Sequence, residues 1–175
     1  SGVAHESVEY TDQTDASILK KGYSVDSPQV SDGLAGYWPL DEDSGNTAYD
    51  FSGNNYDGTT YNGVNQGVTG VTGTSSYSFD GSDDYVNLPD GPKVDRDFTI
   101  SAWINTDGVS DDSQNRNVIY QQTSSETGRW WTFRVQDSKV KLSIDDDSTK
   151  TILYGDSNVA DEKWHHVVAV RDSSE

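Results

Sequence analysis

Turn signals recur along most of this chain, and the segments between them are too short for helices. Ser44-Gly45-Asn46, Asp57-Gly58, Asp80-Gly81-Ser82 and Asp90-Gly91-Pro92 separate runs that are rich in aromatic and β-branched residues. Short strands at such spacing, without helical periodicity, are typical of an all-β sandwich or barrel. From Leu34 onward the sequence therefore predicts antiparallel β-sheets.

Apolar and polar residues alternate in residues 97–104, and this alternation assigns the two faces of a strand. Trp103 falls on the face opposite to the regular apolar set, so the strand carries large apolar groups on both sides. We expect it to be central and covered on both faces. The regular set is Phe98, Ile100, Ala102 and Ile104.

Two further alternating runs, residues 129–135 and 139–144, predict a hairpin around Asp137-Ser138. One face of this hairpin is apolar, and the other carries a tryptophan and three cations. The expected interior of the sandwich consists of Ile100, Ala102, Trp131, Phe133, Val140, Leu142 and Val167. The outward face carries Trp130, Thr132, Arg134, Lys139, Lys141 and Ser143.

Charge limits the partners of the protein. The 175 residues include 30 acidic and 12 basic ones, so the net charge is −18. A surface for nucleic acid or for an anionic membrane would have to overcome this general repulsion, and we exclude nucleic acid as a partner. The acidic residues are spread along the chain, as expected for a halophilic, haloarchaeal-type protein that stays hydrated in concentrated salt. The alternative is an acidic secreted domain from an ordinary environment.

The chain length fits one domain and a short appendage. Residues 1–33 are polar and sparse in large apolar side chains, so we interpret them as a stalk, a linker or an added strand. Residues 34–175 are the predicted sandwich. The chain begins with Ser1-Gly2, which is consistent with a signal peptide, a membrane helix or a filament attachment upstream of residue 1. Without cysteine, the sandwich has no disulfides.

Several segments, in this order, carry a family resemblance: GYWPLD at residues 36–41, DFSGNNYDGT at 50–59, YSFDGSDDYV at 77–86, FTISAWI at 98–104 and KWHHVVAV at 163–170. Together they resemble the laminin G-like domains of the concanavalin A-like lectin and glucanase superfamily, over the stretch from Leu34 to Arg171. The resemblance implies a jelly-roll β-sandwich of two antiparallel sheets in a secreted or cell-surface protein. It also implies binding of glycans or proteins and often a structural calcium ion.

The chain departs from the family pattern at its end, because the family continues with further strands after the segment at 163–170, whereas this sequence stops at Glu175. Either the sequence is truncated, or another chain or the N-terminal appendage supplies the missing strands. The second alternative predicts self-assembly, since an unpaired strand edge recruits a partner.

A candidate calcium site lies in the loop of residues 50–61. Asp50, Asn54, Asn55 and Asp57 offer carboxylate and amide oxygens to a hard cation, and the loop matches a usual calcium position of the resembled family. It lacks the EF-hand pattern. The alternative is a turn held by hydrogen bonds from its Asx side chains.

The candidate ligand site is the outward face of the predicted hairpin. Trp130 is suited to stack on a pyranose, and Arg134, Lys139 and Lys141 are suited to bind a carboxylate or sulfate of an acidic glycan. The alternatives are that Trp130 packs under a loop and that the cations pair with neighbouring aspartates.

Other aromatic and acidic residues have structural interpretations. We expect Trp38, Trp103 and Trp164 in the core and a structural role for His165-His166. No strand shows the inward carboxylate pattern of sandwich glycosidases, and Asp145-Asp146-Asp147 is interpreted as a solvated turn. The sequence thus favours a non-catalytic, extracellular, lectin-like binding or adhesion domain. The alternative is a structural subunit of a surface filament or pilus, and an enzyme ranks third.

The acidic surface predicts a salt-dependent stability. Reducing the salt from about 1 M to about 0.1 M lengthens the Debye length from about 3 Å to about 10 Å, so the carboxylates repel one another more strongly. The melting temperature, followed by circular dichroism, should therefore fall over this range. A melting temperature that stays constant between these limits would contradict an adaptation to concentrated salt.

Overall fold

The computed structural model describes residues 33–71, 75–89, 91–92, 97–107, 116–122, 130–145 and 149–172. The chain divides into two units, Ser1–Leu34 and Ala35–Glu175. The predicted stalk at residues 1–33 lies almost wholly outside the described residues.

Within the described residues the secondary structure consists of β-strands, and all pairings between them are antiparallel. No helix in this part of the chain is long and apolar enough to span a membrane. The strands are β1 (Thr47–Ala48), β2 (Gly58–Tyr61), β3 (Asn65–Thr69), β4 (Ser75–Ser78), β5 (Tyr85–Asn87), β6 (Phe98–Asn105), β7 (Arg116–Gln122), β8 (Trp130–Gln136), β9 (Lys139–Asp145), β10 (Lys150–Tyr154) and β11 (Trp164–Arg171).

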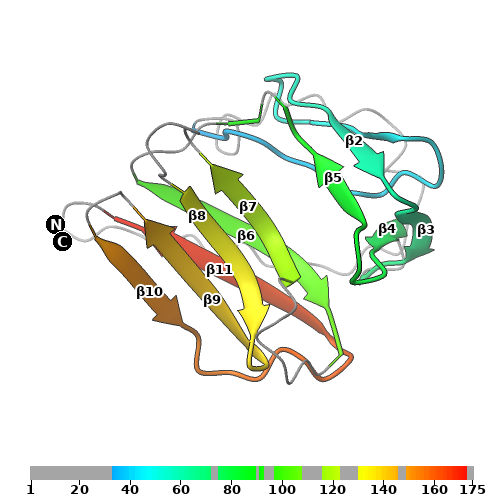
Figure 1. The fold of residues 1–175 in the computed structure, drawn as a ribbon. Helices are drawn as coiled ribbons and strands as arrows, with labels where there is room; N and C mark the ends of the chain where they lie inside the picture. The colour runs from blue at the N-terminus through cyan, green and yellow to red at the C-terminus, as the bar shows by residue number, and fades with distance from the viewer. Residues whose placement is uncertain are drawn as a thin grey trace, which may run out of the picture. The chain divides into compact units, whose positions relative to one another are not determined.

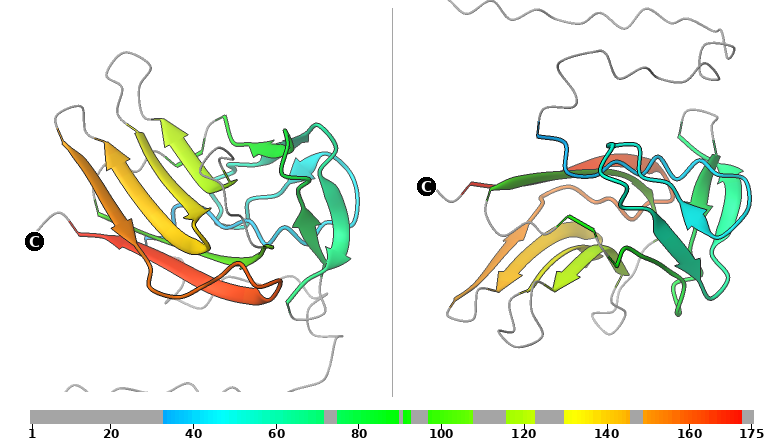
Figure 2. Two further views of the ribbon diagram at one scale, coloured as in Figure 1. Left: turned by 60° about the horizontal axis from the view of Figure 1, so that its bottom comes forward. Right: turned by 90° about the horizontal axis from the view of Figure 1, so that it is seen from above.

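Two sheets face each other across the core. One has the strand order β10-β9-β8-β7, and the other pairs β11 with β6; Figures 1 and 2 show them as two layers. The rings of Phe98 on β6 and Trp131 on β8 meet between the layers, with centroids 5.2 Å apart. The predicted all-β sandwich is confirmed. Its buried apolar cluster comprises Phe98, Trp131, Phe133, Val135, Leu142, Val159, Ala160, Val167 and Ala169.

The predicted interior is also confirmed. Trp131, Phe133, Leu142 and Val167 are buried, while Ile100, Ala102 and Val140 are partly buried and pack against them. Alternation assigned these residues to the correct face because side chains of successive residues in a strand point to opposite sides.

Val159 and Ala160 belong to the core although they lie in no strand. They follow β10 in an irregular segment, and the Val159 N–H donates a hydrogen bond of 2.8 Å to the Ser138 carbonyl. This contact ties the segment to the hairpin turn. The sequence missed both residues because an irregular segment has no period that marks its buried side.

The prediction that residues 97–104 form a central strand covered on both faces is wrong for the described structure. In the part of the chain described here, β6 pairs with β11 alone, and Trp103 on its outer face is 52% exposed. The Trp103 ring contacts the His166 ring of β11, with centroids 5.1 Å apart. Trp103 is therefore a surface residue and not a core residue.

The other two predicted core tryptophans are half-buried. Trp38 lies in a segment without strand structure, and its indole N–H donates a 2.9 Å hydrogen bond to the Tyr56 carbonyl. Trp164 begins β11. The expectation of core burial therefore holds in part for both residues.

The two smaller sheets, β1-β2-β5 and β3-β4, lie at one end of the sandwich (Figures 1 and 2). Close packing within the first sheet requires a glycine, because a Cβ at Gly58 would come within 2.6 Å of the Val86 side chain. The loops that contain the candidate metal ligands connect the strands of these sheets: residues 50–57 lie between β1 and β2, and residues 80–84 lie between β4 and β5.

The hairpin of β8 and β9 forms as predicted. Its register runs without interruption from Trp130 opposite Asp145 to Gln136 opposite Lys139. Asp137 and Ser138 connect the strands with positive φ angles of 51° and 64°. Two positive φ values define a type I′ turn, whose twist matches that of the flanking strands. The turn therefore fixes the register of the whole hairpin.

Replacing Ser138 by glycine should stabilise the domain. Glycine adopts a positive φ without the steric cost that a Cβ imposes, and Asp-Gly is a favoured type I′ pair. We expect Ser138→Gly to raise the free energy of unfolding by about 1 kcal/mol, measured by urea denaturation. As the control, Thr151→Gly in the exposed strand β10 should lower it by about 0.5–1 kcal/mol. A destabilised Ser138→Gly variant would contradict the turn assignment.

Candidate functional site

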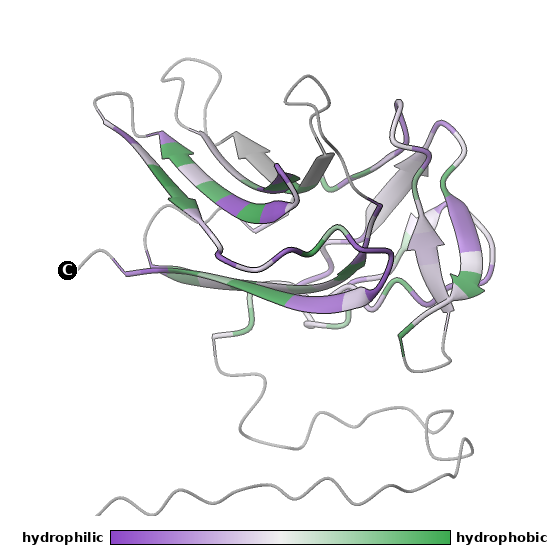
Figure 3. Ribbon diagram, turned by 90° about the horizontal axis from the view of Figure 1, so that it is seen from below, coloured by the Kyte–Doolittle hydropathy of each residue, from purple (hydrophilic) through white to green (hydrophobic). Residues whose placement is uncertain are grey.

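The outward face of β8, β9 and β10 consists of cross-strand rows of side chains. The register aligns each residue of β9 with one neighbour on β8 and one on β10. Figure 3 shows the alternation of hydrophilic and hydrophobic residues along β9. The first row is Trp130, Asp145 and Lys150; the second is Thr132, Ser143 and Ile152; the third is Arg134, Lys141 and Tyr154.

The structure brings the predicted cations together but separates them from the predicted tryptophan. Arg134 lies directly opposite Lys141, and Lys139 lies opposite Gln136 at the turn. Trp130 is four residues from Arg134 on the same strand, about 13 Å away at 3.3 Å per residue. A single pyranose cannot span that distance, so the predicted patch consists of two separate parts.

Lys141 is buried, with 6% of its surface exposed, which corrects the expectation that it faces solvent. Its ammonium donates a 2.7 Å hydrogen bond to Gln136 Oε1 and lies 5.2 Å from the centroid of the Tyr154 ring. The two-stranded pattern missed this burial because β10 adds a third strand, which places Tyr154 beside the lysine.

Two residues of β10 complete this face, and the sequence reasoning overlooked both. Tyr154 is 52% exposed and contacts Lys141, so the aromatic ring beside the cations is Tyr154 rather than Trp130. Lys150 lies over the half-buried Trp130 ring, 5.1 Å from its centroid. The sequence signal that could have predicted strand β10 is the short run at residues 150–154, which is rich in apolar and β-branched residues and ends in an aromatic residue.

The predicted calcium loop is held together by the Asp50 carboxylate. Its two oxygens accept four hydrogen bonds, from Tyr37 N, Ser52 N, Ser52 Oγ and Tyr56 N, at distances of 2.7–3.0 Å. Asp57 Oδ1 accepts a 2.8 Å bond from the Asp50 N–H. The Asn54 side chain donates to the Ala35 carbonyl at 3.2 Å, and Asn55 adopts a φ of 60°. The four predicted ligands thus gather in a turn held by Asx hydrogen bonds.

The protonation of Asp50 reflects these contacts. Burial raises the pKa of this carboxyl, but the hydrogen bonds from Tyr37, Tyr56 and Ser52 outweigh it, so the pKa lies below 3.8. A carboxylate has about four acceptor positions, and all of them are used here. A calcium ion at Asp50 would have to replace some of these hydrogen bonds, and its binding stays a prediction.

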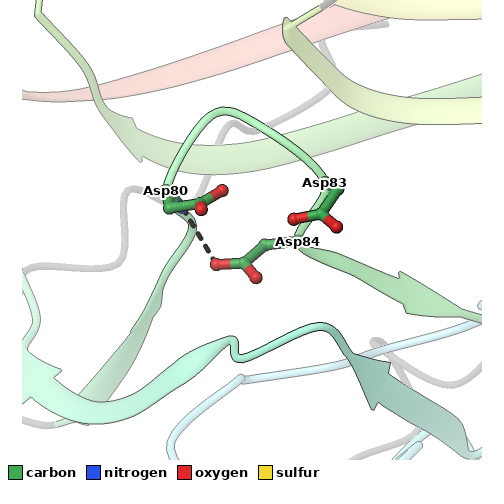
Figure 4. A group of neighbouring side chains, drawn as sticks. All are labelled: Asp80, Asp83 and Asp84. Atoms are coloured by element: carbon green, nitrogen blue, oxygen red, sulfur yellow. Dashed lines mark hydrogen bonds between the residues drawn. The ribbon is translucent and has the colours of Figure 1, made fainter.

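A second group of carboxylates was interpreted from the sequence only as a turn. Ligand atoms of Asp80, Asp83 and Asp84 lie within 4.8 Å of one another in the loop between β4 and β5 (Figure 4). Asp84 Oδ2 accepts a 3.0 Å hydrogen bond from the Asp80 N–H, and Asp80 Oδ1 accepts a 2.7 Å bond from the Ser82 N–H. Such a group can hold a hard cation, yet exposed acidic groups are also common without one.

A hollow of about 520 Å³ adjoins this loop at the end of β6. It is polar, and three of its lining residues are acidic: Asp80, Asp107 and Glu162. Its walls provide carboxylates and no cation, so its chemistry is opposite to that of the face around Lys141.

The two adjacent histidines of β11 differ in their surroundings. His165 Nε2 lies 2.7 Å from Asp161 Oδ1, and Lys163 Nζ lies 3.0 Å from Asp161 Oδ2. Hydrogen bonds from His165 and Lys163 lower the pKa of Asp161 to about 2. Asp161 thereby ties the start of β11 to the loop before it, which agrees with a structural role for His165.

Comparison with known protein families shows where this chain belongs. The sequence profile of the concanavalin A-like lectin/glucanases superfamily, in its laminin G-like branch, matches residues 80–175, which is more than half of the chain. The chain belongs to this superfamily. No curated protein matches, and no solved structure matches either.

The match places both layers of the sandwich inside the superfamily domain, since β5 to β11 all lie within residues 80–175. The face built from β8, β9 and β10 therefore belongs to the superfamily fold. Domains of this laminin G-like branch are commonly binding domains for carbohydrates or proteins. The resembling motifs at residues 36–59 lie before the matched stretch.

Asp50 should make the stability of the domain depend on pH. Its pKa is lowered by folding, so its contribution is present above the unfolded value near 3.8 and is lost as the pH falls through the folded pKa. At pH 7, Asp50→Asn should reduce the free energy of unfolding by about 1–3 kcal/mol, because an amide cannot accept at both positions. The difference from the parent should shrink below pH 3.8.

Denaturant titrations at several pH values measure this effect, with Asp156→Asn in the exposed loop after β10 as the control. Equal losses for both variants at pH 7 would contradict the role assigned to Asp50. A melting temperature that falls on chelation would indicate a bound divalent cation, and the absence of this fall in Asp50→Asn would assign the ion to the Asp50 loop.

Proposed function

We propose that this domain is a non-catalytic, extracellular binding module and that its ligand is an acidic glycan. The ligand lies across the outward face of β8, β9 and β10. The cations Arg134 and Lys141 bind its acidic group, and the exposed Tyr154 ring stacks on the sugar that carries this group. Trp130, with Lys150 above it, forms a second contact for a longer chain.

The observation that carries this proposal is the burial of the Lys141 side chain, which is 6% exposed. In the described structure its contacts are one amide oxygen and one aromatic ring, neither of which bears a full negative charge. Burying a charge without a counter-charge is costly, so such a site is expected where an anion binds. The site is also unusual because the whole chain carries a net charge of −18.

The acidic surface is compatible with an acidic ligand when salt is concentrated. The Debye length is about 3 Å at 1 M salt, so repulsion between the ligand and distant carboxylates is screened. Hydrogen-bonded contacts near 3 Å are screened much less. We therefore propose a protein that works at the surface of a halophilic organism, where general repulsion does not prevent local recognition.

A second candidate function is a structural subunit of a surface filament, and the outer face of β6 and β11 favours it. This face exposes Trp103, Val168 and Val170, at 52%, 49% and 59%. The three side chains lie on neighbouring strands, because Val168 pairs with Ser101 and Val170 with Thr99. Sedimentation of the purified chain in high salt separates the two functions, since a filament subunit self-associates as its concentration rises.

An acidic glycan array tests the proposed function. The parent should be retained on uronic acid-containing glycans, and Tyr154→Ala should weaken retention about fivefold, as expected for an aromatic contact of about 1 kcal/mol. The matched control is Trp103→Ala, because Trp103 is exposed to the same extent, 52%, on the other sheet. Trp130→Ala should weaken the binding of long glycans only.

Circular dichroism confirms that each variant is folded. Equal retention of the parent and Tyr154→Ala would place the ligand elsewhere. No retention of the parent on any acidic glycan would remove the proposed function and leave the filament subunit.

A further inference from the structure

Gln136 Oε1 accepts hydrogen bonds from two cations at once. Arg134 Nη2 donates at 2.5 Å and Lys141 Nζ donates at 2.7 Å. A neutral amide oxygen therefore occupies the position between two positive groups, where a negatively charged oxygen would bind more strongly. Charge-assisted hydrogen bonds are about twice as strong as those between neutral partners.

The hairpin register brings these three side chains together. Gln136 is the last residue of β8, two residues after Arg134 and therefore on the same face. Lys141 lies opposite Arg134 on β9. The Asp137–Ser138 turn fixes this register and thereby the positions of the two cations on paired strands. Gln136 is the last residue of its strand and lies next to the turn.

The Gln136 side chain is only weakly held at its other end. Its amide Nε2 lies 3.5 Å from Asp137 Oδ2, at the limit of a hydrogen bond. Gln136 is partly exposed, whereas Lys141 is 6% exposed. Rotation of Gln136 toward solvent would therefore break the hydrogen bonds that its Oε1 accepts from Arg134 Nη2 and Lys141 Nζ.

We infer that Gln136 holds the position of a ligand carboxylate and that this carboxylate displaces it on binding. This inference rests on the proposed function and specifies its ligand as a uronic acid. The amide and the carboxylate share a planar geometry with trigonal oxygens, so one replaces the other between Arg134 and Lys141. The exposed Tyr154 ring, 5.2 Å from the Lys141 ammonium, then lies beside the pyranose that carries the carboxylate.

Two substitutions of Gln136 have opposite expected effects. In Gln136→Glu, the side-chain carboxylate bonds both cations permanently, so the melting temperature should rise and the affinity for glucuronate should fall about tenfold. In Gln136→Ala, the amide oxygen no longer competes, so the affinity for glucuronate should rise severalfold. Thr151→Glu on exposed β10 changes the net charge equally and controls for general repulsion.

NMR titrations with three matched sugars provide the measurement. Glucuronate should shift the side-chain signals of Arg134, Lys141 and Tyr154 in the parent. Glucose has the same ring without the charge and should not shift them. Glucose 6-sulfate has a tetrahedral anion and should bind several times more weakly than glucuronate.

The outcomes separate this inference from the proposed function. If acidic glycans are retained on the array but Gln136→Glu binds glucuronate like the parent, the displacement of Gln136 is wrong and the proposed function stands. If glucose 6-sulfate binds as tightly as glucuronate, the assignment of a carboxylate is wrong. If glucuronate leaves the three signals unchanged, the inference is wrong whatever the array shows.

Discussion

The register of β8 against β9 depends on the two-residue turn at Asp137 and Ser138. Both residues adopt positive φ angles, and this geometry allows the strands to pair without a bulge from the turn to Trp130 opposite Asp145. Since side chains alternate between faces, a shift by one residue would move Phe133 out of the core and Arg134 into it. The core and the candidate binding face therefore depend on the same turn.

The two faces of this sheet bury side chains of different chemistry. On the inner face, Phe133 is 1% exposed and contributes to the apolar cluster shared with β6 and β11. On the outer face, Lys141 is nearly as well buried but carries a charge. The aliphatic stem of a lysine packs like an apolar side chain, while its ammonium needs polar partners. Gln136 and Tyr154 supply these partners without neutralising the charge.

Charge is distributed unevenly over the described structure. The hollow at the end of β6 and the loop of Asp80, Asp83 and Asp84 are acidic. The outer face of β8, β9 and β10 carries Arg134, Lys139, Lys141 and Lys150, together with Asp145. A chain with 12 basic residues among 175 thus places four of them on one face. This concentration of cations, rather than the net charge, is the basis of the proposed binding of an acidic ligand to this face.

The sequence by itself determined the β-sandwich, the hairpin and the core-facing residues of β8 and β9, because turn residues and a period of two are local properties. It also assigned Arg134, Lys139 and Lys141 to one face. Only the tertiary structure decided that Tyr154 lies beside Lys141, that Trp103 is exposed and that Val159 reaches the core. The physical reason is that contact across strands and removal from solvent depend on residues distant in the chain. A local sequence pattern does not specify which distant segment packs against a given residue.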